Sequence, residues 1–241
     1  MLIKPEERAP LAHLLSFLEL GEHLAHDCAL QQAALSSNEG MCHFFMSQAR
    51  QESFHARTFR MATRWLGAKH MGASPYTHTL HQFRTQLDQA CHRKEFLTTV
   101  LAEQVILEGL GEVMLKKLEH GLMKRQASFQ KLRQLLLYQE EAHHGFGLRV
   151  LERAIIHQDI SVSELREHAQ PFLQLAERLV LSLADLLYSI DEDPNWYLKE
   201  FHQHLPRWLR KPSPIFSNYK FSSHNQCTPE TSIPLLEISN V

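Results

Sequence analysis

Two segments of the sequence place a glutamate three residues before a histidine: Glu52 precedes His55, and Glu140 precedes His143. Residues three or four apart lie on one face of an α-helix. In both segments that face otherwise carries apolar residues at helical spacing, so both pairs should point into the protein core. A buried carboxylate destabilises a fold unless a cation or a hydrogen bond compensates its charge.

Two more acids lie on the apolar faces of predicted helices. Glu22 follows Leu18 in one helix, and Glu108 follows Val105 in another. Four helices therefore supply, in chain order, one Glu, a Glu-x-x-His pair, one Glu and a second Glu-x-x-His pair. This is the ligand set of helix bundles that hold two iron or manganese ions. Two such cations would balance the buried carboxylates, and carboxylate with imidazole suits iron, with manganese as the alternative. The predicted ligands are Glu22, Glu52, His55, Glu108, Glu140 and His143.

Further acids near the predicted ligands leave alternatives open. Glu19 lies at the edge of the helix face that carries Glu22, and Glu112 follows Glu108 by one turn. Either acid could be a further ligand, or could support the ligands through hydrogen bonds. Glu103 is about 140° from Glu108 around an ideal α-helix, so we expect it to face solvent.

The segment EEAHH permits two registers for the second Glu-x-x-His pair: Glu140 with His143, or Glu141 with His144. The first register lies on the longer apolar face, so we favour it. His144 then becomes a candidate for supporting the ligands rather than binding metal. Gln51 and Gln139, which directly precede Glu52 and Glu140, are candidates for the same supporting role.

The hydrophobic periodicity is helical nearly throughout, and no segment alternates as a strand would. Capping residues, prolines and glycines divide the chain into helices. The long helices are predicted at about residues 5–35, 39–66, 95–120, 128–157 and 161–190, and shorter ones begin at residues 75 and 194. In detail, Ser36 with Glu39 and Ser161 with Glu164 read as capping boxes, and Gly67 and Gly121 read as helix stops. Residues 211–241 are rich in Ser, Pro and Asn without periodicity, which predicts an extended tail.

The composition excludes several classes of protein. The net charge is −2 over 241 residues, which gives no general attraction to nucleic acid. No apolar run approaches the length of about 20 residues that a membrane span needs. The N-terminus does not resemble a signal peptide. The four cysteines form no CxxC motif, which favours free thiols and a cytoplasmic location.

Three segments resemble the ferritin-like di-iron superfamily, and in motif they are most similar to the aldehyde-deformylating oxygenases. GEHLAHD (residues 21–27) and VILEGL (residues 105–110) look like the segments around two ligands of that family, and EEAHHGFG (residues 140–147) fits its ExxHxxFG pattern. The resemblance covers about residues 10–190. It implies an all-α, ferritin-like four-helix bundle with additional C-terminal helices, within a domain of residues 1–210.

The resemblance also implies an O₂-dependent di-iron oxidoreductase, an oxygenase or oxidase. One iron would be held by Glu22, Glu52 and His55, the other by Glu108, Glu140 and His143, with Glu52 and Glu140 shared. The substrate would be a small apolar or acyl-derived molecule, reached through an aliphatic channel that includes Leu101, Val105, Leu107 and Leu110. Electrons would come from an external donor, because the chain has no GxGxxG fingerprint for a nucleotide cofactor.

Two other functions would use the same metal site. An RNA-modifying di-iron hydroxylase needs a basic entrance, and the only hint of one is a group of exposed arginines in the second predicted helix: Arg50, Arg57, Arg60 and Arg64. A ferroxidase or iron-handling protein is the other alternative.

Overall fold

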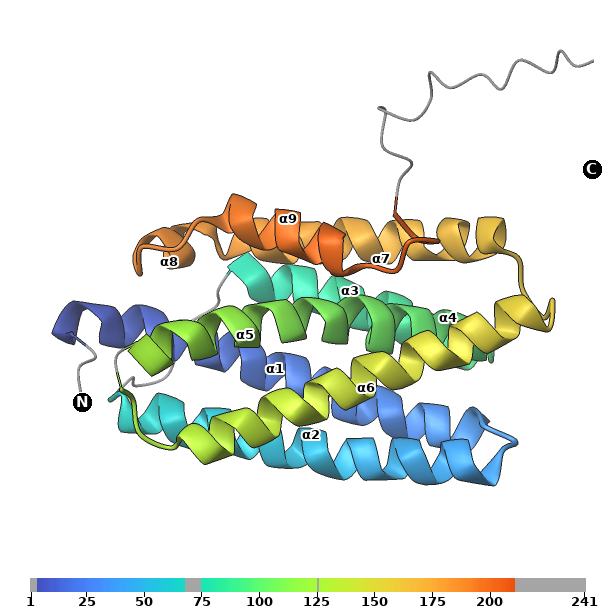
Figure 1. Ribbon diagram of the computed structural model, residues 1–241, viewed down its shortest axis with the longest axis horizontal. Coiled ribbons are helices and arrows are strands. Elements are labelled where there is room, and N and C mark those ends of the chain that lie inside the picture. Colours follow the sequence, from blue (N-terminus) through green and yellow to red (C-terminus); the bar gives the residue numbers. More distant parts are fainter. Residues whose placement is uncertain (1–3, 68–74, 125, 211–241) are drawn as a thin grey trace, which may run out of the picture. The chain divides into compact units, whose positions relative to one another are not determined.

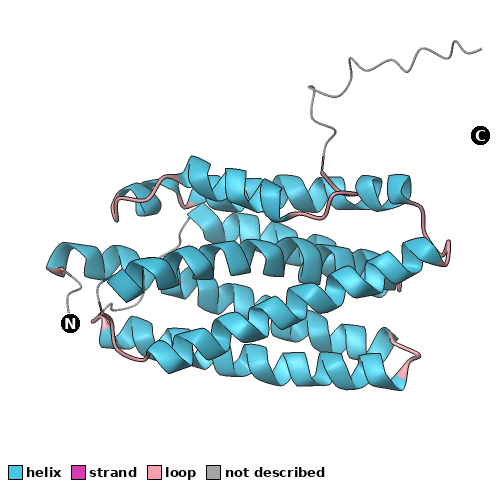
Figure 2. Ribbon diagram, viewed as in Figure 1, coloured by secondary structure: helices cyan, strands magenta, loops and turns pink. Residues whose placement is uncertain are grey.

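The computed structural model describes residues 4–67, 75–124 and 126–210, and every regular element in these ranges is a helix (Figures 1 and 2). The first three are α1 (Pro5–Leu35), α2 (Glu39–Trp65) and α3 (Pro75–His92). One continuous run then contains α4 (Phe96–Val100), the π-helix η1 (Leu101–Leu107) and α5 (Glu108–Lys124). The last four are α6 (Gln130–Ile156), α7 (Val162–Ser182), α8 (Ala184–Tyr188) and α9 (Pro194–His204). The predicted all-α class is confirmed, and the predicted tail of residues 211–241 lies outside the described residues.

Four helical segments form a bundle: α1, α2, the α4–η1–α5 run and α6. The α1–α2 pair packs along its length, and α6 packs against η1 and α5 while it crosses α2 (Figure 1). Helix α3 lies in the connection between the second and third bundle segments and packs on α1 and α7. Helix α9 packs on α5 and α7, so the C-terminal helices cover one side of the bundle.

The ends of the helices follow local rules, with three departures from prediction. The capping box of Ser161 and Glu164 and the helix stop at Gly67, with φ of 81°, are both present. Helix α2 is capped by Asn38, whose Oδ1 accepts the Met41 N–H at 3.0 Å, and not by a box from Ser36. Gly121 does not adopt the left-handed conformation, so α5 continues past it. The helix predicted at 161–190 breaks between α7 and α8.

The π-helix changes which residues face the core. The Glu108 N–H bonds to the Glu103 carbonyl, five residues earlier, whereas an α-helix uses four. Residues five apart therefore lie on one face, and the Glu103 side chain is fully buried beside Glu108. The prediction that Glu103 faces solvent is wrong, because it assumed α-helical rotation through this segment.

Gly147 lets α6 approach η1 closely. A Cβ atom at this position would overlap Cβ of Gln104 and would lie 3.3 Å from Cγ2 of Val105. Because the overlap is with atoms close to the η1 backbone, no side-chain rotation relieves it. The glycine thus sets the separation between the two helices that carry His143 and Glu108.

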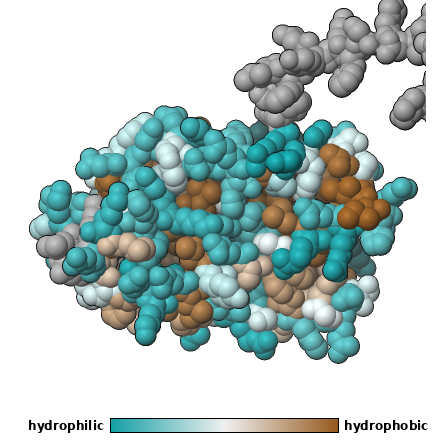
Figure 3. Space-filling model, viewed as in Figure 1, coloured by the Kyte–Doolittle hydropathy of each residue, from teal (hydrophilic) through white to brown (hydrophobic). Residues whose placement is uncertain are grey.

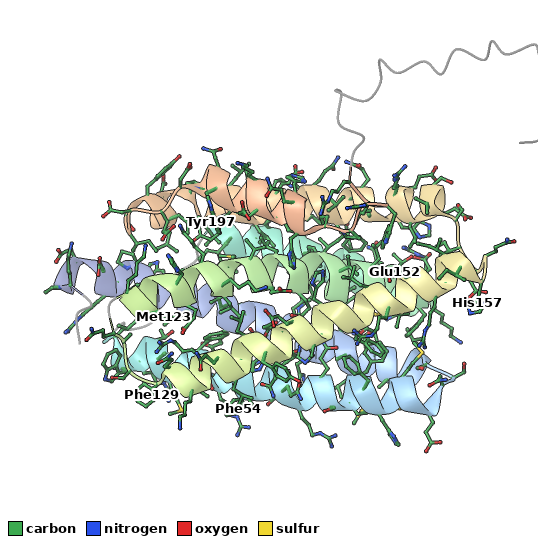
Figure 4. All side chains as sticks on the ribbon, in the orientation of Figure 1. Phe54, Met123, Phe129, Glu152, His157 and Tyr197 are labelled. Carbon is green, nitrogen blue, oxygen red and sulfur yellow. The ribbon has the colours of Figure 1, made fainter. Side chains whose placement is uncertain are left out.

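The surface mixes hydrophilic and apolar side chains, as the space-filling view shows for one face (Figure 3). Exposed apolar side chains lie near the connection between α5 and α6, where Met123 and Phe129 project outward (Figure 4). No helix among the described residues is long and apolar enough to cross a membrane. Of the predicted free thiols, Cys28, Cys42 and Cys91 are free, and Cys227 lies outside the described residues.

Candidate metal centre

All six predicted ligands are buried where the four bundle segments meet. Glu52 and His55 are fully buried, and Glu22 is the most exposed of the set at 8%. The ligand atoms form two groups, within each of which all atoms lie within 4.8 Å of one another. The first group is Glu22, Glu52, His55 and Glu140, and the second is Glu52, Glu108 and His143.

Two carboxylates connect the groups. The two oxygens of Glu52 face different histidines: Oε2 is 3.1 Å from His55 Nδ1, and Oε1 is 2.9 Å from His143 Nδ1. Glu140 Oε1 is 2.8 Å from His55 Nδ1, and the Glu140 side chain also contacts Glu108. Both glutamates therefore lie between the two groups, where ligands shared by two metal ions would be placed.

Several of these atoms are close together without being hydrogen-bonded. Among the described residues, both oxygens of Glu52, Oε1 of Glu140 and Nδ1 of His143 are buried and have no hydrogen-bond partner. Buried polar atoms are rarely left in this state. Oxygens and imidazole nitrogens that converge on common space can be satisfied by cations, and this donor set fits iron or manganese.

Each histidine of the centre is held by a glutamine from the opposite helix. His55 on α2 donates its Nε2–H to Oε1 of Gln139 on α6, at 2.8 Å. His143 on α6 donates its Nε2–H to Oε1 of Gln51 on α2, at 2.7 Å. With the proton on Nε2, the neutral imidazole directs the lone pair of Nδ1 toward the carboxylates, as a metal ligand must. Both glutamines therefore contact the central histidines, and their role in supporting metal ligands stays a prediction.

A chain of buried glutamines, not predicted from the sequence, supports Glu108. Gln48 on α2 donates to Glu108 Oε1 at 2.9 Å, and Gln104 on η1 donates to Gln48 at 3.2 Å. Gln104 and Gln32 on α1 exchange hydrogen bonds at 2.7 and 2.9 Å. Gln48 lies on the same helix face as Glu52, so a polar residue in an apolar face was the available signal.

Glu103 is a further buried carboxylate beside the centre. Its Oε1 accepts a long hydrogen bond of 3.5 Å from Gln48, and its Oε2 has no partner among the described residues. Burial raises the pKa of Glu103 to about 8, even though its contact with Glu108 acts in the opposite direction. Nothing in the sequence identifies this residue, because only the π-helix turns it inward.

The electrostatics of the centre reflect many acids and few bases. Burial raises the pKa of Glu22 and of Glu108, and the charge of Glu140 adds to the effect on both. The pKa of Glu52 is lowered despite its burial, because His143 and His55 lie against it. Burial opposes protonation of His55, but its contacts with Glu140, Glu22 and Glu52 outweigh burial and raise its pKa. Without a cation, the centre therefore retains protons that a metal would displace.

Three candidates for further ligands or supporting residues lie outside the two ligand groups: Glu19, Glu112 and His144. Glu19 is in neither group, and its carboxylate accepts a hydrogen bond from Arg60 Nε at 2.7 Å. Glu112 and His144 contact each other at 2.9 Å and form a separate cluster with His204. Glu141 is about half exposed, with 46% side-chain accessibility, so the alternative register of α6 does not supply a buried pair.

A narrow apolar cavity of about 40 Å³ reaches the centre. It is bordered by the carboxylates of Glu22, Glu108 and Glu140, and its apolar lining comes mainly from α1 and α5. The lining includes Phe17, Leu18, Ala25, Leu107, Leu110 and Met114. Of the four residues expected to form a channel, Leu107 and Leu110 take part, whereas Leu101 and Val105 are fully buried elsewhere in the core.

The helical bundle and its carboxylate- and histidine-rich centre define a ferritin-like fold. Among solved structures, the chain is similar to a protein from Synechococcus described as having aldehyde deformylating oxidase activity. The two share 18% sequence identity with a TM-score of 0.72, over 85% of this chain and 89% of that chain. No protein-family model and no curated protein matches the sequence. The structural similarity confirms the predicted ferritin-like fold.

Proposed function

We propose that the chain is an O₂-dependent di-iron oxidoreductase acting on a small apolar or acyl-derived substrate. The observation that carries this proposal is the pair of ligand groups that share Glu52 and adjoin Glu140, with both histidines oriented by glutamines. The structural similarity to a protein described as an aldehyde deformylating oxidase supports the same class of chemistry. The apolar cavity at Glu22, Glu108 and Glu140 supports an apolar substrate.

In this proposal each iron has its own histidine. Glu22, Glu52 and His55 would hold one ion, Glu108, Glu140 and His143 would hold the other, and Glu52 and Glu140 would be shared. Iron bound there would supply redox chemistry with O₂, with electrons from an external donor. Gln51 and Gln139 hold the Nε2 protons of the histidines, and Gln48 fixes one oxygen of Glu108.

The protein's own contribution to substrate binding is the cavity. Its aliphatic wall would bind an apolar chain by the hydrophobic effect and exclude water from the centre. At about 40 Å³ it is smaller than such a substrate, so its lining must move on binding. Met114 is suited to this movement because its side chain is unbranched and has several rotatable bonds.

The test is reconstitution of the full chain with Fe²⁺, followed by assays under O₂ with a chemical reductant. We expect a pair of magnetically coupled irons by Mössbauer spectroscopy, and product formation from an aliphatic aldehyde. Turnover of Fe²⁺ alone to a mineral product would support the ferroxidase alternative. Hydroxylation of RNA would support the RNA-modifying hydroxylase. A centre that binds one zinc and no coupled iron pair would contradict the di-iron proposal.

A further inference from the structure

A second cluster of metal-ligating side chains lies outside the two ligand groups of the bundle centre. It comprises Glu112 on α5, His144 on α6 and His204 at the end of α9. His144 Nδ1 is 2.9 Å from Glu112 Oε2, His204 Nε2 is 3.0 Å from the same oxygen, and the two nitrogens are 3.0 Å apart. Three donor atoms thus form a nearly equilateral triangle.

Hydrogen bonds alone do not satisfy this triangle. If both imidazole nitrogens donate to Glu112 Oε2, their two hydrogens oppose each other across the 3.0 Å contact between the rings. If one ring donates to the other, the accepting nitrogen directs its lone pair at the carboxylate oxygen. Beside an ionised Glu112, every arrangement of protons on neutral imidazoles therefore leaves one repulsive contact, because each nitrogen is either a donor or an acceptor. A cation that accepts all three lone pairs removes the conflict.

The distances fit a common metal geometry. Zinc and similar ions bind imidazole nitrogen and carboxylate oxygen at about 2.0–2.2 Å. Donors at right angles around such an ion are then about 3.0 Å apart, and tetrahedral donors about 3.4 Å apart. The observed separations of 2.9–3.0 Å match three ligands on one face of an octahedron, with other positions open.

The surroundings hold the three side chains in place. Lys116 Nζ is 2.5 Å from the other oxygen of Glu112, which leaves Oε2 directed at the histidines. Gly109 lies against both rings: a Cβ there would be 3.4 Å from His144 Nε2 and 3.6 Å from His204 Cδ2. Helix α9 is anchored by two buried aromatic residues, Tyr197, which is labelled in Figure 4, and Phe201.

The cluster opens onto a surface pocket. Glu112 and His144 are buried, whereas the His204 side chain is 28% exposed and lines a pocket of about 630 Å³. Further polar side chains around this pocket include Lys117, His120, Glu200 and Gln203. An ion bound by the cluster could therefore exchange with solvent through the pocket that His204 lines.

We propose that Glu112, His144 and His204 bind a single divalent transition-metal ion, at a site separate from the bundle centre. Two imidazoles and one carboxylate select ions such as Zn²⁺ or Fe²⁺ over Mg²⁺ and Ca²⁺, which prefer oxygen ligands. The site borders the surface pocket at His204, and a small anionic or neutral ligand that enters the pocket would complete the coordination.

The test is a Zn²⁺ titration of the full chain, with the stoichiometry compared between the wild type and His204→Gln. We expect the variant to bind one Zn²⁺ fewer per chain, or to bind that ion more than about 100-fold more weakly, since losing even a supporting residue weakens metal binding 10- to 100-fold. The matched control is His202→Gln on the same helix, whose ring pairs with Glu177 at 3.1 Å. It should bind as many ions as the wild type.

Zinc-edge anomalous diffraction from the unmodified protein provides a second measurement that does not depend on a variant. We expect an anomalous peak within bonding distance of all three side chains at saturating Zn²⁺. Equal stoichiometry in the wild type and His204→Gln, or no peak among the three residues, would overturn the proposal. Both measurements report Zn²⁺ bound at Glu112, His144 and His204, so their result does not depend on whether the bundle centre holds iron.

Discussion

At the scale of single residues, the glutamines that contact the two central histidines carry a testable role. In Gln139→Leu, His55 loses the acceptor for its Nε2–H, and the ring loses the constraint that directs Nδ1 inward. We expect iron affinity to fall by about 10- to 100-fold, which is typical when such a supporting partner of a metal ligand is removed. Titration against a competing chelator measures the change.

Gln139→Glu is the matched control, because a carboxylate still accepts the His55 proton and should retain most of the affinity. Gln51→Leu should repeat the effect at His143, since Gln51 Oε1 contacts Nε2 of that residue at 2.7 Å. Unchanged affinity in both leucine variants would show that the two hydrogen bonds do not tune metal binding.

The adjacent histidines of α6 should respond differently to truncation. His143 lies in the centre, within 2.9 Å of Glu52, whereas His144 contacts Glu112. His143→Ala should therefore abolish the coupled iron pair and nearly all O₂-dependent turnover. His144→Ala should keep both central irons, which Mössbauer spectra and activity would show together. The reverse pattern would move the ligand assignment on α6 by one residue.

The burial and clustering of the six proposed ligands could be predicted, because each of these polar residues interrupts an apolar helical face and a buried charge needs compensation. Gln48 lies on such a face too, but an uncharged amide there is a weaker signal than a carboxylate, because its burial needs only hydrogen bonds. Glu103 and Gln104 could not be predicted, because their burial depends on the π-helical rotation of η1. His204 is far from the other residues of its cluster in sequence, and only packing of α9 brings it to Glu112.

At the scale of elements, the contact between α6 and η1 depends on a glycine. In Gly147→Ala, the added methyl group overlaps Gln104, so the helices must separate or η1 must shift. We expect the free energy of unfolding to fall by about 1–3 kcal/mol, which is the usual range for overpacking a core. Chemical denaturation measures this change.

Gly145, two residues earlier on α6, offers a matched control. A Cβ there would approach only the end of the Arg149 side chain, which is flexible. Gly145→Ala should leave stability unchanged or raise it by up to about 1 kcal/mol, because alanine favours the helix. Equal destabilisation by both substitutions would show that close packing at residue 147 is not the cause.

Most helices could be predicted because their apolar periodicity is long and their ends carry local signals. Ser161 and Gly67 act as their residue types suggest. Gly121 and the break after α7 were not predictable in this way, because tertiary packing decides whether a glycine ends a helix or continues it. The π-helix has no residue-type signal, and its segment reads as an ordinary apolar helix.

At the scale of the whole molecule, burying so many acids should make stability depend on pH and on metal binding. In the metal-free fold, burial leaves Glu22, Glu103 and Glu108 with raised pKa values, near 8 for Glu103. Above about pH 5 these acids ionise in the unfolded chain but keep protons in the fold, so rising pH favours unfolding. The raised pKa values of His55 and His143 act in the same direction, since the stability they add declines as pH rises.

We therefore expect the metal-free protein to melt at a lower temperature than the iron-loaded protein at neutral pH. The difference should shrink as pH falls from about 8 toward 5, because the metal-free fold keeps the protons on its buried acids while protons compete with iron for the same carboxylates. Differential scanning calorimetry of both forms across this range measures it. Equal melting temperatures at neutral pH would argue that these carboxylates do not repel one another in the fold.

The π-helical segment also affects how this chain must be compared with its relatives. The hydrogen bonds of η1 span one residue more than those of an α-helix, so η1 accommodates one extra residue and shifts the register of everything on one side of it. A relative with an uninterrupted α-helix here would match Glu108 and the residues after it, yet need a one-residue gap to match Thr98 and Thr99. Gap placement in alignments usually avoids helices, and a gapless alignment would pair Glu103 with a solvent-facing position. Homology searches that anchor on Glu108 should therefore allow an insertion inside the third bundle helix.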